Sequence, residues 1–165
     1  MELSQSLHPE VVFVNVLGTA RLFALVLTIS SPSLKQTAPA LIGHWQVGAP
    51  YETNQSAGLN NTQENYIESL HLEYDRNRLR VCGKDVPIQS IKAEALTEED
   101  FLDRYHFHPT LIGVGESNIL ELSITAPDAT PFCGEYGEPG LHVFVGDNKH
   151  AVIEVANDYF PLIRH

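Results

Sequence analysis

The chain has 165 residues, which is enough for one domain with a packed core. Hydrophobic residues make up 43% of it, so the composition excludes a largely disordered chain. Acidic residues number 21 and basic residues 10, which gives a formal net charge of −11 at pH 7. This charge repels phosphate backbones, so we expect no nucleic-acid partner. It would attract a basic protein or a cationic ligand, or else serve solubility alone.

The first forty residues form a candidate targeting segment. Residues 11–29 are mostly apolar, but Arg21 in their middle makes them a poor membrane-spanning helix. A secretory signal fits better, with Arg21 as its positive start, Leu22–Ile29 as its apolar stretch and the A-P-A sequence at 38–40 as its cleavage motif. Two acidic residues near the start are unusual for a signal. A buried helix or an uncleaved anchor is therefore the alternative.

Removal of a targeting segment over residues 1–40 would leave one domain over residues 41–165. We expect that domain in the periplasm or the medium, with no stable membrane span after processing. The cysteines agree with export, because Cys82 and Cys133 are the only two, and an even pair in a short exported chain predicts a disulfide. Two unrelated thiols are the alternative. Neither cysteine has C-x-x-C or zinc-site spacing.

From Leu41 onward apolar and polar residues mostly alternate with a period of two. This is the pattern of strands with one face buried and one exposed. Turn sequences rich in Asp, Asn and Gly separate the apolar runs, the clearest at 146–149. Strands are expected at 41–47, 69–74, 78–81, 86–95, 120–125, 141–145, 151–156 and, as a short last strand, 159–163.

One helix is expected after Thr97, which would cap it ahead of three carboxylates in the first turn. It must end before Pro109. Residues 48–65 lack any period and residues 125–140 are rich in Pro and Gly, so both are predicted to be loops. About eight short strands with one short helix predict an all-β fold, an antiparallel β-barrel or a sandwich, and a closed barrel leaves no free edge.

Gly43-His44-Trp45 opens the first predicted strand, and Arg164 follows the last one. This Gly-x-Trp sequence with a terminal arginine resembles the lipocalins and the wider calycin group. Over residues 41–164 the chain is also similar to small exported bacterial proteins of that kind. The resemblance implies a lipocalin-like antiparallel β-barrel in which Gly43, Trp45 and Arg164 form a structural unit at the barrel floor, the guanidinium stacked on the indole. The chain is short for a lipocalin, which argues against a large lipid cavity.

Four histidines are weak candidates for metal ligands. His106 and His108 would point the same way on a strand, but the favoured interpretation is two surface histidines at the end of a helix. His142 and His150 flank a turn, across which they could face each other. No third ligand follows from the spacing, and no haem-attachment motif occurs. We therefore predict no cofactor and no metal site, and keep a haem- or metal-binding barrel as the alternative.

No catalytic set emerges, since no serine lies in a G-x-S-x-G turn. The loop after Cys133 carries Glu135, Tyr136 and Glu138, an aromatic ring between carboxylates, which suits a protein-binding surface; a plain connector is the alternative. The sequence thus predicts an exported, monomeric, non-enzymatic binding protein. It would bind or inhibit a cationic protein, or hold a small apolar ligand in the barrel mouth.

Overall fold

The computed structural model describes residues 38–55, 58–115, 117–127, 131–146 and 150–165. The predicted targeting segment therefore lies outside the described residues up to position 37. In chain order the elements are the 3-10 helix η1 (Pro39–Leu41), β1 (Gly43–Val47), α2 (Asn61–Glu68), β2 (His71–Asp75), β3 (Arg78–Val81), β4 (Lys84–Pro87), β5 (Ser90–Leu96), α3 (Glu98–Tyr105), the 3-10 helix η2 (Pro109–Ile112), β6 (Ile119–Thr125), the 3-10 helix η3 (Gly134–Tyr136), β7 (His142–Val145), β8 (Ala151–Val155) and β9 (Asp158–Arg164).

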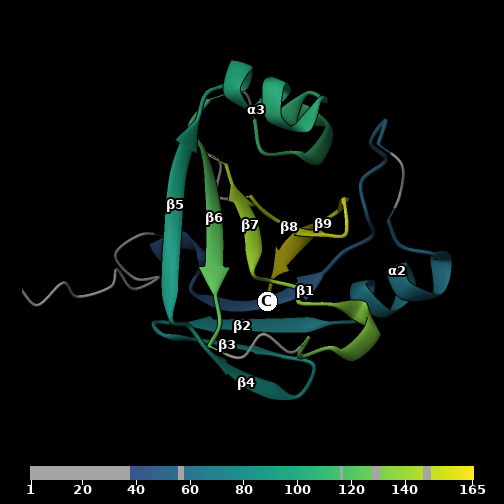
Figure 1. Cartoon of the computed structure of the whole chain (residues 1–165), viewed down its shortest axis with the longest axis vertical. Coiled ribbons are helices and arrows are strands. Elements are labelled where there is room, and N and C mark those ends of the chain that lie inside the picture. The colour runs from purple at the N-terminus through teal and green to yellow at the C-terminus, as the bar shows by residue number, and fades with distance from the viewer. Residues whose placement is uncertain (1–37, 56–57, 116, 128–130, 147–149) are drawn as a thin grey trace, which may run out of the picture.

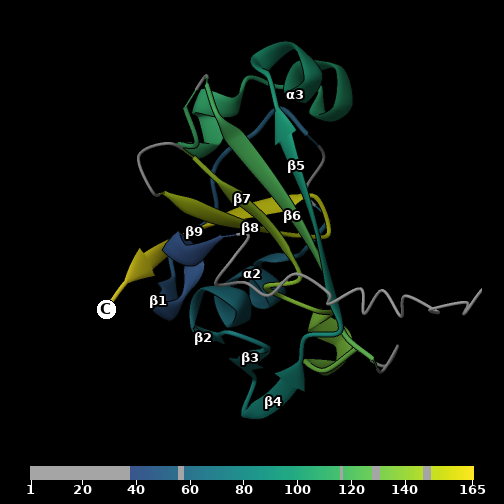
Figure 2. The ribbon, with the colours of Figure 1, turned by 90° about the vertical axis from the view of Figure 1, so that its left-hand side faces the viewer.

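The nine strands form one antiparallel sheet in the order β4-β3-β2-β1-β9-β8-β7-β6-β5. The sheet curls into a half-barrel, so that β2, β3 and β4 run across the lower ends of β5 and β6 (Figure 1). Seen from the side, β5, β6 and β7 rise away from β2–β4 (Figure 2). The predicted all-β, antiparallel, barrel-like fold is confirmed, with nine strands in place of about eight.

The sheet ends at β4 and β5 because the predicted strand 86–95 is broken. The backbone N–H of Ile88 donates to Asn77 O at 2.8 Å, and that of Gln89 donates to Thr125 O at 2.8 Å. These two bonds send the chain in opposite directions, so β4 stays beside β3 while β5 joins β6. No pairing joins β4 to β5 among the described residues. The expected single strand is therefore wrong, and the sheet remains an open half-barrel.

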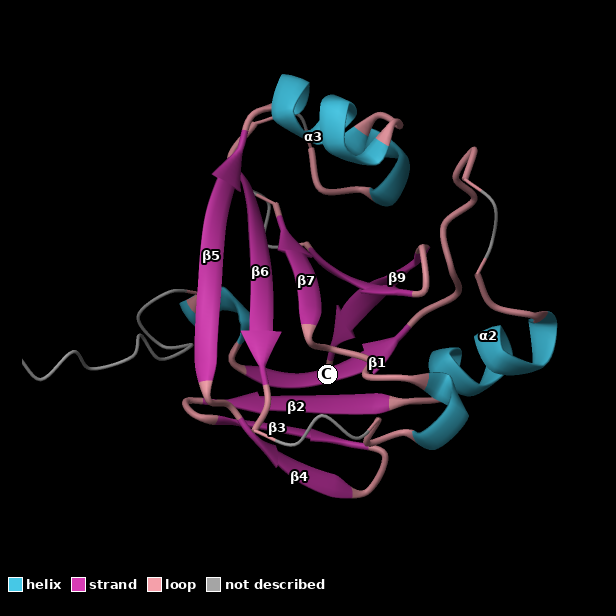
Figure 3. Ribbon diagram, viewed as in Figure 1, coloured by secondary structure: helices cyan, strands magenta, loops and turns pink. Residues whose placement is uncertain are grey.

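The described residues contain two α-helices, which lie apart from each other (Figure 3). The expected helix is α3, capped by Thr97 as predicted and ended before Pro109. The other, α2, lies mostly within the segment predicted to be a loop. It starts with a capping box, in which the Asn60 side chain accepts from Gln63 N at 3.1 Å and the Gln63 side chain accepts from Asn60 N at 3.0 Å. Capping outweighs the weak apolar pattern there, where only Ile67 is buried.

The sheet carries a hydrophobic core on each face. The larger core lies inside the curl and includes Leu72, Leu79 and Leu122. A smaller aromatic core lies on the other face, beneath α3, where Phe101 meets Phe144 edge-on with ring centroids 5.6 Å apart. Strands such as β6 and β7 thus bury both of their faces, at least in part.

Trp45 and Arg164 tie the two ends of the described chain together. They are direct partners in the β1–β9 register, so Arg164 closes the last strand rather than following it. Its guanidinium lies 4.8 Å from the centre of the Trp45 ring and donates to Ala40 O and Ile42 O at 2.8 and 3.1 Å. Gly43 has φ +139°, which favours glycine, and a Cβ there would meet this guanidinium.

The 3-10 helix η1 is packed onto the barrel at the same place. Trp45 Nε1 donates to Leu41 O at 2.7 Å, and Leu41 and Ala38 are buried. Residues 38–40, predicted to belong to the targeting segment, thus contact the domain in this structure. The domain boundary at residue 40 stays a prediction.

Replacement of Trp45 by Ala is expected to lower the free energy of unfolding by about 3–5 kcal/mol, because a buried aromatic, its hydrogen bond and its cation–π contact are lost together. Urea unfolding followed by circular dichroism measures this. A loss below about 1 kcal/mol would show that Trp45 is not a core residue.

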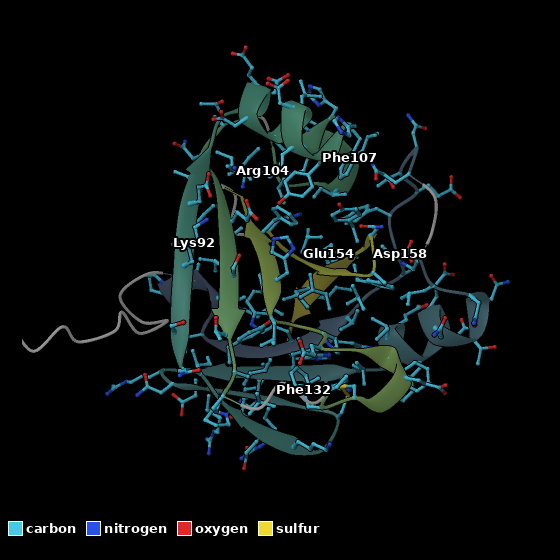
Figure 4. The ribbon with its side chains drawn as sticks, viewed as in Figure 1. Lys92, Arg104, Phe107, Phe132, Glu154 and Asp158 are labelled. Carbon is cyan, nitrogen blue, oxygen red and sulfur yellow. A yellow bond between two sulfur atoms is a disulfide. The ribbon has the colours of Figure 1, made fainter. Side chains whose placement is uncertain are left out.

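The predicted disulfide between Cys82 and Cys133 is present. It joins the β3–β4 turn to the segment before η3, 51 residues away in sequence. Phe132 and Cys133 are buried in the larger core (Figure 4). The bond therefore fastens the segment that carries Glu135, Tyr136 and Glu138 to the curl of the sheet.

Replacement of both Cys82 and Cys133 by Ala is expected to lower the free energy of unfolding by about 4 kcal/mol, since a closed loop of this length restricts the unfolded chain. Urea unfolding of the oxidised protein and the double variant measures the difference. Equal midpoints would mean that the bond does not stabilise the fold.

Candidate functional site

A cavity of about 570 Å³ lies between the strands β6–β8 and the loop that contains η3. We call it the acidic pocket. Four carboxylates line it together with one histidine and one tyrosine: Glu121, Glu135, Tyr136, Glu138, His142 and Glu154. The structure thus brings the three predicted loop residues close to His142. Their spacing in the sequence could not predict this proximity.

The strand register sets the floor of this pocket. His142 is opposite Ser123 on β6, and the pairing of Val143 with Ile153 sets it beside Glu154 on β8. The expectation that His142 faces His150 is therefore wrong. The turn at 147–149 lies outside the described residues, but the flanking strands pair as in a hairpin.

His142 is held between two carboxylates. Its Nδ1 lies 2.8 Å from Glu154 Oε2 and its Nε2 lies 2.9 Å from Glu121 Oε1. A carboxylate only accepts hydrogen bonds, so both ring nitrogens must donate. With a carboxylate at each ring nitrogen, this geometry favours the doubly protonated imidazolium of His142.

The helix α3 completes the hydrogen bonds of Glu121, the only charged residue that is buried among those described. Tyr105 donates its hydroxyl to Glu121 Oε1 at 2.8 Å. Arg104 donates from Nη1 to Glu121 Oε2 and from Nη2 to Glu94 Oε1 at 2.7 Å. Figure 4 labels Arg104 on α3 and Glu154 on β8.

These contacts shift the ionisation of the cluster. Burial alone would lower the pKa of His142, but the hydrogen bonds and charges of Glu154 and Glu121 outweigh burial and raise it. Burial alone would raise the pKa of Glu154, but His142 and the N–H of Asn157 lower it. Burial and the bond to Glu121 raise the pKa of Tyr105. The charged forms of His142 and Glu154 therefore stabilise each other.

The rim of the pocket is different from its floor. Glu135 is exposed and Glu138 is half-buried, and neither forms an ion pair with another described residue. Tyr136 stacks on Tyr66 of α2 with ring centroids 3.8 Å apart, which holds the loop in place. The rim therefore carries negative charge that the described part of the chain leaves unbalanced.

His106 and His108 lie at and just after the end of α3, not on a strand. His106 ends α3 in a left-handed conformation with φ 60°, and His108 caps η2. His108 Nε2 contacts Glu98 Oε1 at 2.8 Å. Over the described ranges, no three or more His, Cys, Asp or Glu side chains are placed to hold a metal ion.

A second cavity of about 900 Å³ lies beside Trp45 and Arg164, where η1 meets β9. Ile42, Leu162 and Ile163 are among its apolar lining residues. It adjoins the residues predicted to form the barrel floor, not the barrel mouth in which the sequence places a small apolar ligand. His150 also lines this cavity, away from His142.

Sequence reasoning missed Glu121, Glu154 and Arg104. Glu121 alternates with Leu120 and Leu122, the pattern of a solvent-facing strand residue, and Glu154 sits among apolar residues without a motif. Only the register and the position of α3 bring them to His142. A charged residue between strongly apolar neighbours on a strand was the sole available signal.

Comparison of the chain with models of known families, with curated proteins and with solved structures finds no match. The site must therefore be interpreted from its own chemistry. Among the described residues no helix has the length and apolar character needed to cross a membrane.

We expect His142→Gln to destabilise the protein by about 2 kcal/mol near pH 5.5, because hydrogen bonds between charged groups are lost. The folded-state pKa of His142 lies above its ordinary 6.5, so its contribution is complete below 6.5 and is lost as the pH rises through the folded value. Glu154 has a lowered pKa, so its contribution is complete above 4.5 and is lost as the pH falls. Urea unfolding across this range measures the difference, and a constant difference up to about pH 8.5 would contradict the imidazolium.

Proposed function

We propose that this chain is an exported, non-enzymatic binding protein that receives a positively charged group of its partner in the acidic pocket. The observation that carries the proposal is the rim, where Glu135 and Glu138 flank Tyr136 without an ion pair among the described residues. Carboxylates attract ammonium and guanidinium groups, and an aromatic ring offers them a cation–π face. The partner class favoured is a basic protein, which binding would sequester or inhibit.

Rigid support favours a binding role for the rim. The disulfide fixes the loop at Cys133, and the Tyr66–Tyr136 stack fixes it at its centre. A loop held in its binding conformation loses less entropy when a partner docks. The net charge of −11 adds long-range attraction for a basic partner.

Kinship with the lipocalin-like barrels and export are part of the same proposal. Support for kinship is the unit of Gly43, Trp45 and Arg164 on a curled antiparallel sheet. Support for export is the disulfide, which persists in oxidising compartments, together with the signal-like sequence before residue 38.

A second candidate is the binding of a small apolar ligand in the cavity beside Trp45. Its volume of about 900 Å³ and the side chains of Ile42, Leu162 and Ile163 favour this. Binding of haem or a metal through His142 has less support, because both ring nitrogens already contact carboxylates.

Replacement of Glu135 and Glu138 by Gln is expected to slow association with a basic partner about fivefold at low salt, because two attractive charges are lost. High salt should slow the wild type similarly. Tyr136→Ala should instead speed dissociation, because an aromatic anchor is lost. Partners captured from the periplasm or medium are measured by surface plasmon resonance at two salt concentrations.

The matched control is Glu99→Gln with Asp103→Asn, which removes two exposed carboxylates from α3, where they line a different hollow. This control should change the association rate much less than the rim variant. Binding that ignores both salt and the rim substitutions would show that the loop is only a connector.

A further inference from the structure

The floor of the acidic pocket contains a histidine that contacts two carboxylates. His142 bridges Glu121 and Glu154 from neighbouring strands, and contact of each ring nitrogen with a carboxylate favours its imidazolium form. The side chains are 25%, 10% and 21% exposed for His142, Glu121 and Glu154. They are therefore shielded enough for charge balance to matter, and still open to the cavity.

The two carboxylates differ in their other partners. Glu121 also accepts hydrogen bonds from Arg104 and Tyr105, and these bonds do not depend on the protonation state of His142. Glu154 has the backbone N–H of Asn157 at 2.7 Å, but His142 is its only cationic partner among the described residues. Loss of the His142 proton would therefore leave Glu154 as the unbalanced charge of the floor.

The remaining charged and titratable groups around the floor add negative charge. Asp158 on β9 and Glu135 and Glu138 on the rim are acidic, and Glu94 on β5 is already shared between Arg104 and Lys92. Tyr159 on β9 is neutral, because burial and the nearby carboxylates raise its pKa. None of these groups can replace the imidazolium at Glu154. An incoming cation can.

We propose that a ligand ammonium or guanidinium group binds at Glu154 in exchange for the proton of His142. In this exchange the Nδ1–H bond of His142 breaks, the proton passes to solvent, and the ligand cation replaces it as the partner of the Glu154 carboxylate. This rests on the proposed function and adds its floor subsite, ligand class and proton linkage. Cation binding then strengthens as the pH rises, whereas simple rim attraction has no such dependence.

The test uses n-butylguanidinium as the probe and neutral n-butylurea, which has nearly the same shape, as its control. Isothermal titration calorimetry in buffers of different ionisation enthalpy counts the protons released. We expect close to one proton per probe bound at about pH 6, and an affinity that rises by up to about tenfold per pH unit until His142 is neutral. The urea should not bind.

Variants separate the floor from the rest of the molecule. His142→Gln should bind without releasing a proton and without the rise in affinity, and Glu154→Gln should lose most of the affinity. His108→Gln is the matched control, since it removes a histidine–glutamate pair at α3 and η2 and should leave the proton release intact. Thermal melts of each variant report whether it is folded.

The outcomes distinguish this inference from the proposed function. Probe binding at the pocket without proton release, or release that survives in His142→Gln, overturns the exchange but leaves cation binding at the rim. Absence of binding at every pH, with amide chemical shifts of the pocket residues unchanged, overturns both.

Discussion

A buried carboxylate must be compensated by donors, and this constraint organises one face of the molecule. The whole Glu121 residue, backbone included, is only 8% exposed, so an ionised carboxylate there requires partners close by. His142 supplies one from the neighbouring strand, and Tyr105 and Arg104 supply two more from α3. The same contacts hold α3 over the sheet beside the aromatic core. Removal of Arg104 or Tyr105 would therefore affect both the pocket and the position of the helix.

Alternation predicted much of the fold because it reports which face of a strand is buried. The hairpin turns, the α3 cap at Thr97 and the disulfide followed from local chemistry. The alternation of apolar and polar residues does not show which strands are neighbours. It therefore could not predict the break at Ile88–Gln89 or the open edges of the sheet. The helix α2 was missed for a related reason, since its capping box stabilises it with only one buried side chain.

The site was less predictable than the fold, because its residues meet across four segments. His142 was noticed for its chemistry, but the partner expected for it was His150, which lines the other cavity. The expected partner lies four residues from the observed one, Glu154, and the error was possible because residues at this spacing point to the same face of a strand. Glu135, Tyr136 and Glu138 were found because a loop beside a disulfide is rigid, exposed and polar at once.

The acidic pocket and the cavity beside Trp45 have opposite chemistry, and the difference decides which function is better supported. The cavity beside Trp45 contains the guanidinium of Arg164, but this group already donates to Ala40 O and Ile42 O and lies over the indole. The Arg164 guanidinium therefore stabilises the fold and is not available to bind a ligand. In the acidic pocket the floor is balanced internally by His142 and Arg104, while the rim carboxylates lack ion pairs within the described chain. The rim carboxylates Glu135 and Glu138 serve neither packing nor a local ion pair among the described residues, so they are free to attract another molecule. Because they lie beside His142, whose proton we propose a ligand displaces, the pocket favours a positively charged ligand.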